Sequence, residues 1–535
     1  MKYNSRRSAV YSRRGMVASS QPLASVAGIK ILQAGGNAAD AAVAVSAALN
    51  VTEPTSTGIG GDCFSLFFEA SSKTVKGVNG SGRAPEELTV ENLVNRGVTG
   101  NMPSHSIHTI TVPGAAAGWV DTIERFGTME MKEVLAPAIE LAKQGFPIAP
   151  ITAKRWQYGA TRLKSGPKYN EMLINGRGPT VGEIMRNPTL AKTFEELATH
   201  GKAGFYEGRI AQAIVDLIAP RGSFMTLEDL RNHTNTFPDP IKTDYRGYDV
   251  YEIPPNGQGI TALIALNIVE GYDFSGVKHS SVEHLHTLIE AMRLAFADAR
   301  WYVADPDVVH VPIEELISKE YAAERRKLIE SSRANVSVKK GSPVAGSDTV
   351  YFCTADSEGN ACSFINSNYM GFGTGLIPKG CGFTLQNRGA NFSLDPEHPN
   401  CVGPSKRPYH TIIPGMVMKD NELYGPFGVM GGFMQPQGHL QVLVNLIDYG
   451  MDPQEALDAP RFCISSGMSY GSVALEEGIP LEVMAALSQM GHVISPRAGA
   501  YRSGFGRGQI ILRDPVSGVL CAGSDPRADG MAIGL

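Results

Sequence analysis

The residue with the clearest chemical potential in this chain is Thr349, in the run Gly346-Ser-Asp-Thr-Val-Tyr-Phe. A threonine hydroxyl attacks carbonyl groups poorly unless a base lies beside it. A cut between Asp348 and Thr349 would place a new α-amino group next to the hydroxyl. That amine is a suitable base, because its unperturbed pKa of about 7.7–8.0 lies close to the working pH. The sequence therefore predicts self-cleavage at Asp348–Thr349 and nucleophilic catalysis by Thr349.

The residues that follow Thr349 predict a β-hairpin that positions it. Residues 349–356 have the composition of a strand, Ser357-Glu-Gly-Asn that of a turn, and residues 361–367 that of a return strand. Counting back from the turn places Ser367 or Asn368 opposite Thr349, depending on the turn type. A second polar side chain is therefore expected to face the nucleophile.

The segment before Thr349 predicts an exposed linker. Residues 330–346 are rich in Ser, Lys, Gly and Pro and show no hydrophobic periodicity. Cleavage at its end would give a large subunit, residues 1–348, and a small subunit, residues 349–535.

The remaining elements show helical patterns early in the chain and strand patterns later. Ala-rich helices are expected over residues 24–50 with a break at 35–37, and further helices over 114–230 and 260–302. Strands are expected at 64–68, 245–253, 415–418, 424–429 and 509–512. This order fits either two domains or an α+β stack in which both parts share one core.

Bulk composition excludes several classes of function. Of the 535 residues, 43% are hydrophobic and 19% charged, and the net charge is −5. With a pI near 6.2 and scattered Lys and Arg, nothing resembles the basic footprint of a nucleic-acid or anionic-membrane binder. The N-terminus has no apolar signal region, and the most apolar stretch, residues 38–51, is too short to span a bilayer. We expect a cytoplasmic protein with no membrane or nucleic-acid partner.

Cysteine and histidine usage gives no sign of a metal or cofactor. The seven cysteines are odd in number and contain no C-x-x-C pair, which argues against a disulfide scaffold and a zinc site. His284 and His286 are not spaced to converge on one face of a helix, so they are expected to be ordinary helix residues. We expect no metal and no cofactor.

Motifs along almost the whole chain resemble the gamma-glutamyltranspeptidase (glutathione hydrolase) family of N-terminal nucleophile hydrolases. They include Gly15-Met-Val-Ala-Ser, Gly35-Gly-Asn-Ala-Ala-Asp, Val112-Pro-Gly-Ala-Ala-Ala-Gly, Gly371-Phe-Gly-Thr-Gly, Gly403-Pro-Ser-Lys-Arg-Pro and Ser524-Asp-Pro-Arg. The resemblance implies an α+β fold, a four-layer αββα sandwich with two antiparallel sheets between helical layers. It also implies that the two cleavage products form one composite domain, as a heterodimer or a dimer of such heterodimers.

The resemblance also implies a mechanism. Thr349 would take an acyl group from an amide and pass it to water or to an amine acceptor. The N–H groups of Gly431 and Gly432 match the family's donors to the tetrahedral oxyanion. Ser367 falls where the family has a Thr that hydrogen-bonds the nucleophile, in agreement with the hairpin count.

The residues matching the family's substrate pocket depart from its usual pattern. Arg83 matches the Arg that binds the substrate α-carboxylate, a role suited to a bidentate guanidinium. Typical members hold the α-ammonium with an Asn, a Gln and an Asp, and this chain has Tyr369, Arg388 and Asn391 at those positions. Where typical members carry two adjacent serines, this chain has His410 and Thr411. Arg388 would repel an ammonium group. The expected substrate is a γ-glutamyl amide or a related glutaryl-type amide, with the second favoured.

Two other functions compete with this interpretation. Gly467-Met-Ser-Tyr-Gly satisfies the G-x-S-x-G pattern of serine esterases, with Ser469 as nucleophile. That motif requires a strand before it and a helix after it, which the flanking sequence does not predict. Alternatively, Asp348 and the altered pocket residues would leave the protein unprocessed and without catalytic activity.

Overall fold

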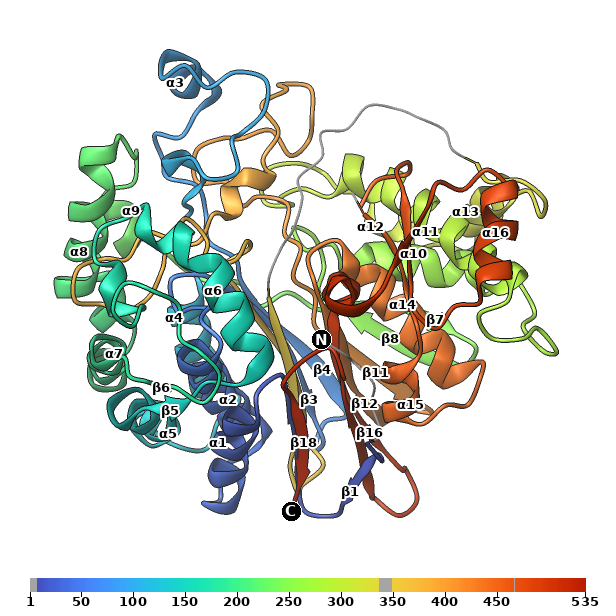
Figure 1. The fold of residues 1–535 in the computed structure, drawn as a ribbon, viewed down its shortest axis with the longest axis horizontal. Coiled ribbons are helices and arrows are strands. Elements are labelled where there is room, and N and C mark those ends of the chain that lie inside the picture. The colour runs from blue at the N-terminus through green and yellow to red at the C-terminus, as the bar shows by residue number, and fades with distance from the viewer. Residues whose placement is uncertain (1–6, 336–348, 466) are drawn as a thin grey trace.

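Two antiparallel β-sheets stacked face to face form the centre of the molecule, with helices covering both outer faces (Figure 1). This computed structural model describes residues 7–335, 349–465 and 467–535. The architecture is the four-layer αββα sandwich that the sequence resemblance implies.

Both sheets draw strands from either side of residue 349. The seven-stranded sheet has the order β1 (Val10–Ser12), β17 (Leu520–Ser524), β16 (Arg507–Arg513), β12 (Glu422–Met430), β11 (Gly415–Lys419), β8 (Tyr248–Glu252), β7 (Ile241–Tyr245). The six-stranded sheet has the order β18 (Met531–Gly534), β2 (Met16–Ser19), β9 (Val350–Ala355), β10 (Ala361–Ser367), β3 (Asp62–Glu69), β4 (Thr74–Gly80). The single strand expected at 245–253 is in fact the turn and second strand of the β7–β8 hairpin.

The helices fall into two groups, one on each outer face (Figure 1). On the six-stranded sheet's side lie α1 (Pro22–Gln33), α2 (Ala38–Thr52), α4 (Ala115–Phe126), α5 (Met131–Gln144), α6 (Pro150–Lys164), α7 (Pro188–Tyr206), α8 (Gly208–Ile218) and α9 (Leu227–Arg231). On the other side lie α10 (Gly259–Val269), α11 (Val282–Tyr302), α12 (Ile313–Leu316), α13 (Lys319–Arg326), α14 (Met434–Ile447), α15 (Pro453–Asp458) and α16 (Leu481–Gln489). Shorter elements are α3 (Val90–Asn95), the pair β5 (Phe146–Pro147) and β6 (Ile184–Met185), and a small sheet of β13 (Phe462–Ile464), β14 (Val473–Glu476) and β15 (Ile494–Arg497).

The side chains of strand β9 point alternately into two different hydrophobic cores. Val350 and Phe352 pack in the core between the six-stranded sheet and its helices. Tyr351 and Cys353 point the other way, into the core between the two sheets. Successive strand side chains face opposite sides, so a strand buried on both faces reads as a continuous apolar run.

Helix α2 anchors the turn end of the β9–β10 hairpin. All of its residues are buried, and Asn37 begins it with a capping box completed by Asp40. The Ala38 N–H donates to Asp356 Oδ2 over 2.9 Å, and the Thr354 hydroxyl donates to the Ala38 carbonyl over 2.6 Å. With the turn fixed there, the hairpin's other end carries Thr349 and Ser367 toward the opposite end of the sheet.

The cysteines form no disulfides, and the helices do not reach membrane-spanning length and apolarity, in the part of the chain that the structure describes. The seven cysteines all lie within the described residues and none is in a disulfide. None of the described helices is both long enough and apolar enough to cross a membrane.

Candidate active site

Thr349 and Ser367 face each other at the open end of the hairpin. Val350 pairs with Asn366, so the register continues to Thr349 opposite Ser367, as the count from the turn predicts. Both side chains are fully buried, and the two hydroxyl oxygens are 3.1 Å apart. Asp348, the other side of the predicted cleavage site, lies outside the described residues.

The hydroxyl of Ser367 is oriented by its other partners. Arg388 Nη2 donates to Ser367 Oγ over 3.1 Å, and the Tyr369 N–H donates to the same oxygen over 2.9 Å. A serine oxygen has two lone pairs and one proton. Ser367 is thus held next to Thr349 by two donors, and either hydroxyl can donate in the contact between them.

Arg388 is the centre of the arrangement. It lies fully buried in a 3₁₀ turn, Arg388–Asn391, where its Nη1 donates to Thr411 Oγ1 over 2.7 Å. Its Cζ is 4.6 Å from the centroid of the Tyr369 ring. Among the described residues, Arg388 Nε has no hydrogen-bond acceptor. One guanidinium thus brings together Ser367, Tyr369 and Thr411, three residues selected from the sequence.

Asp62, at the start of β3, supplies the charge that faces Arg388. Its Oδ2 is 3.9 Å from Arg388 Nε. Its Oδ1 accepts from the N–H groups of Gly82 and Gly114 and from Gln386 Nε2, at 3.0, 3.2 and 3.0 Å. Burial lowers the pKa of Arg388 to about 10, with Asp62 opposing the shift, so the guanidinium stays protonated at neutral pH. Asp62 could not be identified from the sequence, because a polar residue at a strand start after a Gly-rich turn carries no functional pattern.

His410 is a neutral, fully bonded side chain. Burial lowers its pKa to about 4, reinforced by Arg388 and opposed by Asp62. Its Nε2 donates to Asp62 Oδ2 over 3.0 Å, and its Nδ1 accepts from the Ile412 N–H over 3.3 Å. Its ring packs against Phe64 with centroids 4.6 Å apart. Since both nitrogens are engaged, His410 positions Asp62 and offers no free base.

Gly431 and Gly432 lie beside this cluster, between β12 and α14. Their φ angles of +136° and +60° favour glycine. Gln258 Nε2 donates to both the Gly432 carbonyl, over 2.9 Å, and the Thr411 carbonyl, over 2.6 Å. In the part of the chain that the structure describes, neither glycine N–H donates to an acceptor. Two such N–H groups suit stabilisation of an oxyanion, and that role stays a prediction.

Arg507 connects Thr349 to the glycine pair. Its Nη2 donates to the Thr349 carbonyl over 3.2 Å, and its Nε is 3.3 Å from the sulfur of Met430, the residue before Gly431. Its charge is balanced by the buried carboxylate of Glu53. Arg507 and Glu53 could not be identified from the sequence, because a single charged residue at the end of an element shows a role only once its partners are known.

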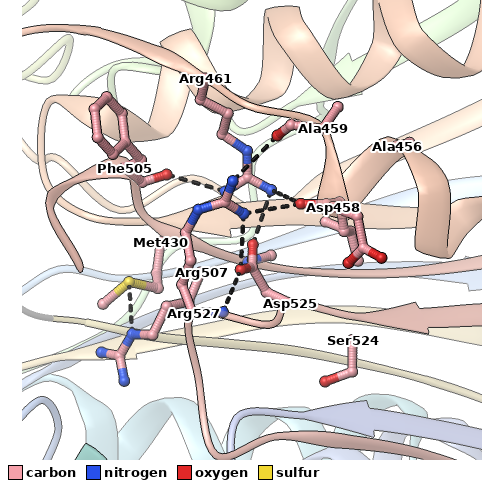
Figure 2. A network of polar contacts seen from close by, with 12 residues as sticks. Met430, Ala456, Asp458, Ala459, Arg461, Phe505, Arg507, Ser524, Asp525 and Arg527 are labelled. Carbon is pink, nitrogen blue, oxygen red and sulfur yellow. Dashed lines mark hydrogen bonds and ion pairs between the residues drawn. The ribbon is translucent and has the colours of Figure 1, made fainter. Parts of the chain in front are cut away.

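A buried ionic cluster fixes the backbone on both sides of Arg507 (Figure 2). Asp525 Oδ2 accepts from the Gly508 N–H over 2.8 Å and forms an ion pair with Arg461 at 2.8 Å. Arg461 Nη1 in turn donates to the Phe505 carbonyl over 3.0 Å. The start of β16 is therefore held rigidly where Arg507 meets Thr349.

Arg83 and Asn391 were both expected to bind substrate, and this role stays a prediction; the side chain of Asn391 hydrogen-bonds Tyr369. The guanidinium of Arg83 pairs with Asp307 at 3.0 Å and donates to the Thr234 carbonyl over 3.1 Å. Asn391 belongs to the same turn as Arg388, and its backbone carbonyl accepts from Asn400 Nδ2 over 2.7 Å. The carboxylate-binding role expected of Arg83 would require it to leave Asp307 or to share its donors.

A cavity of about 420 Å³ opens beside the glycine pair. Tyr369, Met430 and Gly431 form part of its wall, so it adjoins the cluster around Thr349. It is the space that a substrate could enter next to the glycine N–H groups.

Ser469 does not sit on a nucleophile elbow. Its segment links β13 to β14, which pair antiparallel, so no helix follows the motif. Its backbone carbonyl accepts from Arg293 Nη1 over 2.9 Å. The strand–turn–helix geometry of a G-x-S-x-G hydrolase is therefore not formed around it.

Within the described ranges, one trio of side chains could offer three metal ligands: His286, Glu290 and His492. Its members already bond within the protein. His286 Nδ1 is 2.9 Å from His492 Nε2, and Glu290 lies 3.5 Å from Arg293 and accepts from the Asn335 N–H over 2.8 Å. A cation would have to compete with Arg293, so we interpret the trio as a structural cluster.

Comparison with known proteins gives one family over nearly the whole chain. The family model described as Gamma-glutamyltranspeptidase matches residues 24–535. The sequence is 38% identical over 530 residues to the Glutathione hydrolase-like YwrD proenzyme of Bacillus subtilis (strain 168), covering 98% of this chain and 99% of that one. It is 34% identical over 534 residues to the Acylase ACY 1 proenzyme of Pseudomonas sp. (strain SE83), covering 98% and 94%. A crystal structure of cephalosporin acylase from Bacillus halodurans is similar with a TM-score of 0.93 and 46% identity, covering 100% of this chain and 98% of that one.

Proposed function

We propose, from the premise that this chain belongs to the gamma-glutamyltranspeptidase family and is an enzyme, that it is a self-processing amidohydrolase for glutaryl-type amides. Cleavage between Asp348 and Thr349 would convert a single-chain proenzyme into a heterodimer. The mature enzyme would transfer an acyl group that ends in a carboxylate, through an ester on Thr349, to water or to an amine.

The observation that carries the substrate assignment is the position of Arg388. Arg388 hydrogen-bonds Ser367, which in turn hydrogen-bonds Thr349. The Nε of Arg388 has no acceptor among the described residues. The nearby Asp62 already receives four other donors, from two backbone N–H groups, Gln386 and His410. Two like charges 4 Å apart repel by about 4 kcal/mol at an effective dielectric constant near 20. This cluster therefore disfavours an α-ammonium and favours a terminal carboxylate. The similarity to two acylases supports the same choice.

Self-cleavage would begin with attack of Thr349 Oγ1 on the Asp348 carbonyl carbon. The C–N bond breaks, the nitrogen takes the proton and becomes the α-amine of Thr349, and an ester joins the two segments. Water then hydrolyses the ester, leaving a carboxylate on Asp348 and a free hydroxyl on Thr349. Arg507 contributes by holding the Thr349 carbonyl, which fixes the residue on its other side.

Turnover would use the same hydroxyl on an amide substrate. The α-amine accepts the Thr349 proton as Oγ1 attacks the carbonyl, and Ser367 donates to the attacking oxygen. The oxyanion is stabilised by the N–H groups of Gly431 and Gly432, each typically worth about 2.7–4 kcal/mol. The amine leaves with the proton, and water or a second amine releases the acyl group from the ester.

The test compares three anilides that share a leaving group, with glutaryl, γ-glutamyl and butanoyl acyl groups. We expect the purified protein to hydrolyse the glutaryl anilide with at least a tenfold higher kcat/KM than either of the others. Arg388→Gln should reduce this preference, because it removes the charge and keeps a donor, whereas Arg388→Lys should retain part of it. A clear preference for the γ-glutamyl anilide would overturn the assignment.

Thr349→Ala is the control on the nucleophile. This variant should remain a single chain of 57.2 kDa by intact mass and show no turnover. Ser469→Ala should process and turn over normally. An enzyme that survives Thr349→Ala and is inactivated by Ser469→Ala would instead be a serine esterase.

A further inference from the structure

We propose that the buried ion pair of Arg507 and Glu53 sets the pH at which Thr349 becomes active, by favouring the uncharged form of the α-amine that cleavage would create. The inference rests on the proposed function, because that function assigns the α-amine as the base. It goes further by identifying two residues outside the reacting groups that control the charge of this base.

Arg507 lies close enough to the future amine to act on it through space. Its Nη2 donates to the carbonyl of the fully buried Thr349 over 3.2 Å. The nitrogen that would become the amine belongs to the same residue and is three covalent bonds from that carbonyl oxygen. It therefore lies within about 7 Å of the guanidinium. A positive charge at this range disfavours a second one, so the amine is kept neutral and able to accept a proton.

Glu53 balances Arg507 from the side away from the nucleophile. Its carboxylate forms the ion pair with Arg507 and accepts from the hydroxyl groups of Ser20, over 2.6 Å, and Ser56, over 3.0 Å. Arg507 hydrogen-bonds both Glu53 and Thr349, so its guanidinium lies between them. The pair thus presents its positive end to the amine, and the carboxylate weakens that effect without cancelling it.

Burial makes the field of this pair effective. Arg507 is 2% exposed and Glu53 is 0% exposed. Charges shielded from solvent are screened by salt much less than charges at the surface. Among the described residues, Glu53 is the one carboxylate that pairs with Arg507, whose Nε lies 3.3 Å from the uncharged sulfur of Met430. We therefore expect the effect on the amine to persist at high ionic strength.

Other charged groups approach Thr349 from different elements. Arg388, in its 3₁₀ turn, reaches the nucleophile through one serine hydroxyl, and Asp62 at the start of β3 lies 3.9 Å from that arginine. Behind the start of β16, Asp525 and Arg461 pair with each other at 2.8 Å. These groups contribute to the charge of the amine in the wild type. They are the same in every variant compared below, so the differences between variants report on the proposed pair.

The first test measures protonation of the amine without any substrate. In mature protein carrying ¹³C-methyl-labelled threonine, the Thr349 methyl signal, assigned by its absence in Thr349→Ser, is followed by NMR as pH changes. Arg507→Gln removes the positive charge and should raise the titration midpoint by about 1–2 pH units. Glu53→Gln removes the negative charge and should lower it by about half a unit or more. A purely structural role of the pair does not predict shifts in opposite directions.

Two further variants keep the test independent of folding defects. Arg507→Lys retains the charge and should stay within about half a unit of the wild-type midpoint. The double variant, Glu53→Gln with Arg507→Gln, leaves no unpaired buried charge, which is the usual reason for such single variants to unfold. Its midpoint should lie between those of the wild type and Arg507→Gln.

The matched control is Arg325→Gln. It breaks another arginine–carboxylate pair, with Asp298, between α13 and α11 in the outer helical layer. This variant should keep the wild-type midpoint. Equal midpoints in the wild type, Arg507→Gln and Glu53→Gln would overturn the proposal.

The pH dependence of turnover separates this inference from the proposed function. The rising limb of kcat/KM for the glutaryl anilide should move with the NMR midpoint in each variant, because it reports the free enzyme's base. If the NMR midpoints shift as expected but no anilide is hydrolysed, the proposed function fails and the role of the pair stands. Hydrolysis with an unmoved midpoint would give the reverse result. A chain that stays uncut has no α-amine at Thr349 and would overturn both.

Discussion

At the scale of single residues, the hydrogen-bond partners of each polar side chain decide whether it can donate or accept a proton. Two donors hold the Ser367 oxygen 3.1 Å from the Thr349 oxygen, so the two hydroxyl groups share a hydrogen bond. Both nitrogens of His410 are engaged when the ring is neutral, so it holds Asp62 without taking a proton. Two charged side chains lie nearby: Arg388 donates to Ser367, and Arg507 donates to the Thr349 carbonyl. In the mechanism that we propose, this cluster would support one proton transfer, from Thr349 to the α-amine that cleavage would create.

The neutral state of His410 predicts a pH-dependent stability. The native pKa is about 4, below the ordinary value of 6.5, so the unfolded chain takes up the proton first as pH falls. Its stabilising contribution is complete above about pH 6.5 and is lost as pH falls through 4. This contribution of His410 to the free energy of unfolding is up to about 3 kcal/mol. We expect His410→Gln to show a smaller drop in thermal midpoint between pH 7 and pH 4.5 than the wild type.

The control for this measurement is His310→Gln, which changes an exposed histidine. It should keep the full pH dependence of the wild type. The other buried histidines are present in all three proteins and cancel in the comparison. An identical midpoint drop in His410→Gln and wild type would show that the ring is not held neutral.

At the scale of elements, local pairings could be predicted from the sequence and distant ones could not. The β9–β10 register follows from a short turn, so counting residues placed Ser367 or Asn368 opposite Thr349, and the structure has Ser367 there. The contact of Asp62 with His410 spans 348 positions, and that of Arg507 with Thr349 spans 158. Such pairs depend on how the two sheets stack, and no periodicity within either segment encodes that. For the same reason the engagement of Arg83 by Asp307 could not be anticipated.

The close approach of β12 to β9 gives a prediction about sheet packing. A Cβ on Gly428 would lie 2.5 Å from the Tyr351 ring, so Gly428→Ala must push the two strands apart. We expect a loss of about 1–3 kcal/mol in stability, seen as a lower thermal midpoint. Because β9 begins directly after Thr349, self-cleavage should also slow, as measured by the rate at which the 57.2 kDa chain disappears on a denaturing gel.

Gly403→Ala is the matched control, because its Cβ would meet only the Lys406 side chain at 3.9 Å. It should leave both the midpoint and the cleavage rate unchanged. If Gly428→Ala behaved like this control, the sheets would have to be more loosely packed than their geometry indicates.

At the scale of the whole molecule, the two segments share both sheets and the helical layer on the seven-stranded sheet, whereas the other helical layer comes from the first segment. Strands β2, β3 and β4 pair within the same sheet as β9, β10 and β18, and β1, β7 and β8 pair within the same sheet as β11, β12, β16 and β17. Separating the segments would expose strand edges in both sheets and the core between them. The two products of the proposed cleavage are thus halves of one folding unit.

This sharing predicts that cleavage does not release either product. The mature protein should elute as a single species in native size-exclusion chromatography, show two bands on a denaturing gel, and unfold in one transition in denaturant. Thr349→Ala, uncut, should elute at the same position as the cut protein. Elution of either segment alone in native buffer would contradict the prediction.

The ends of the chain meet in both sheets, which constrains the order of events during synthesis. β1 pairs with β17, and β2 lies between β18 and β9, so residues near position 10 wait for partners beyond position 520. Neither sheet is complete until residues 520–534 have been synthesised, and pairings between such distant segments form slowly. A cut at Thr349 that requires the closed sheets would therefore act as a checkpoint. Chains lacking residues 520–534 would stay uncut, and maturation would report that these residues had been made and paired.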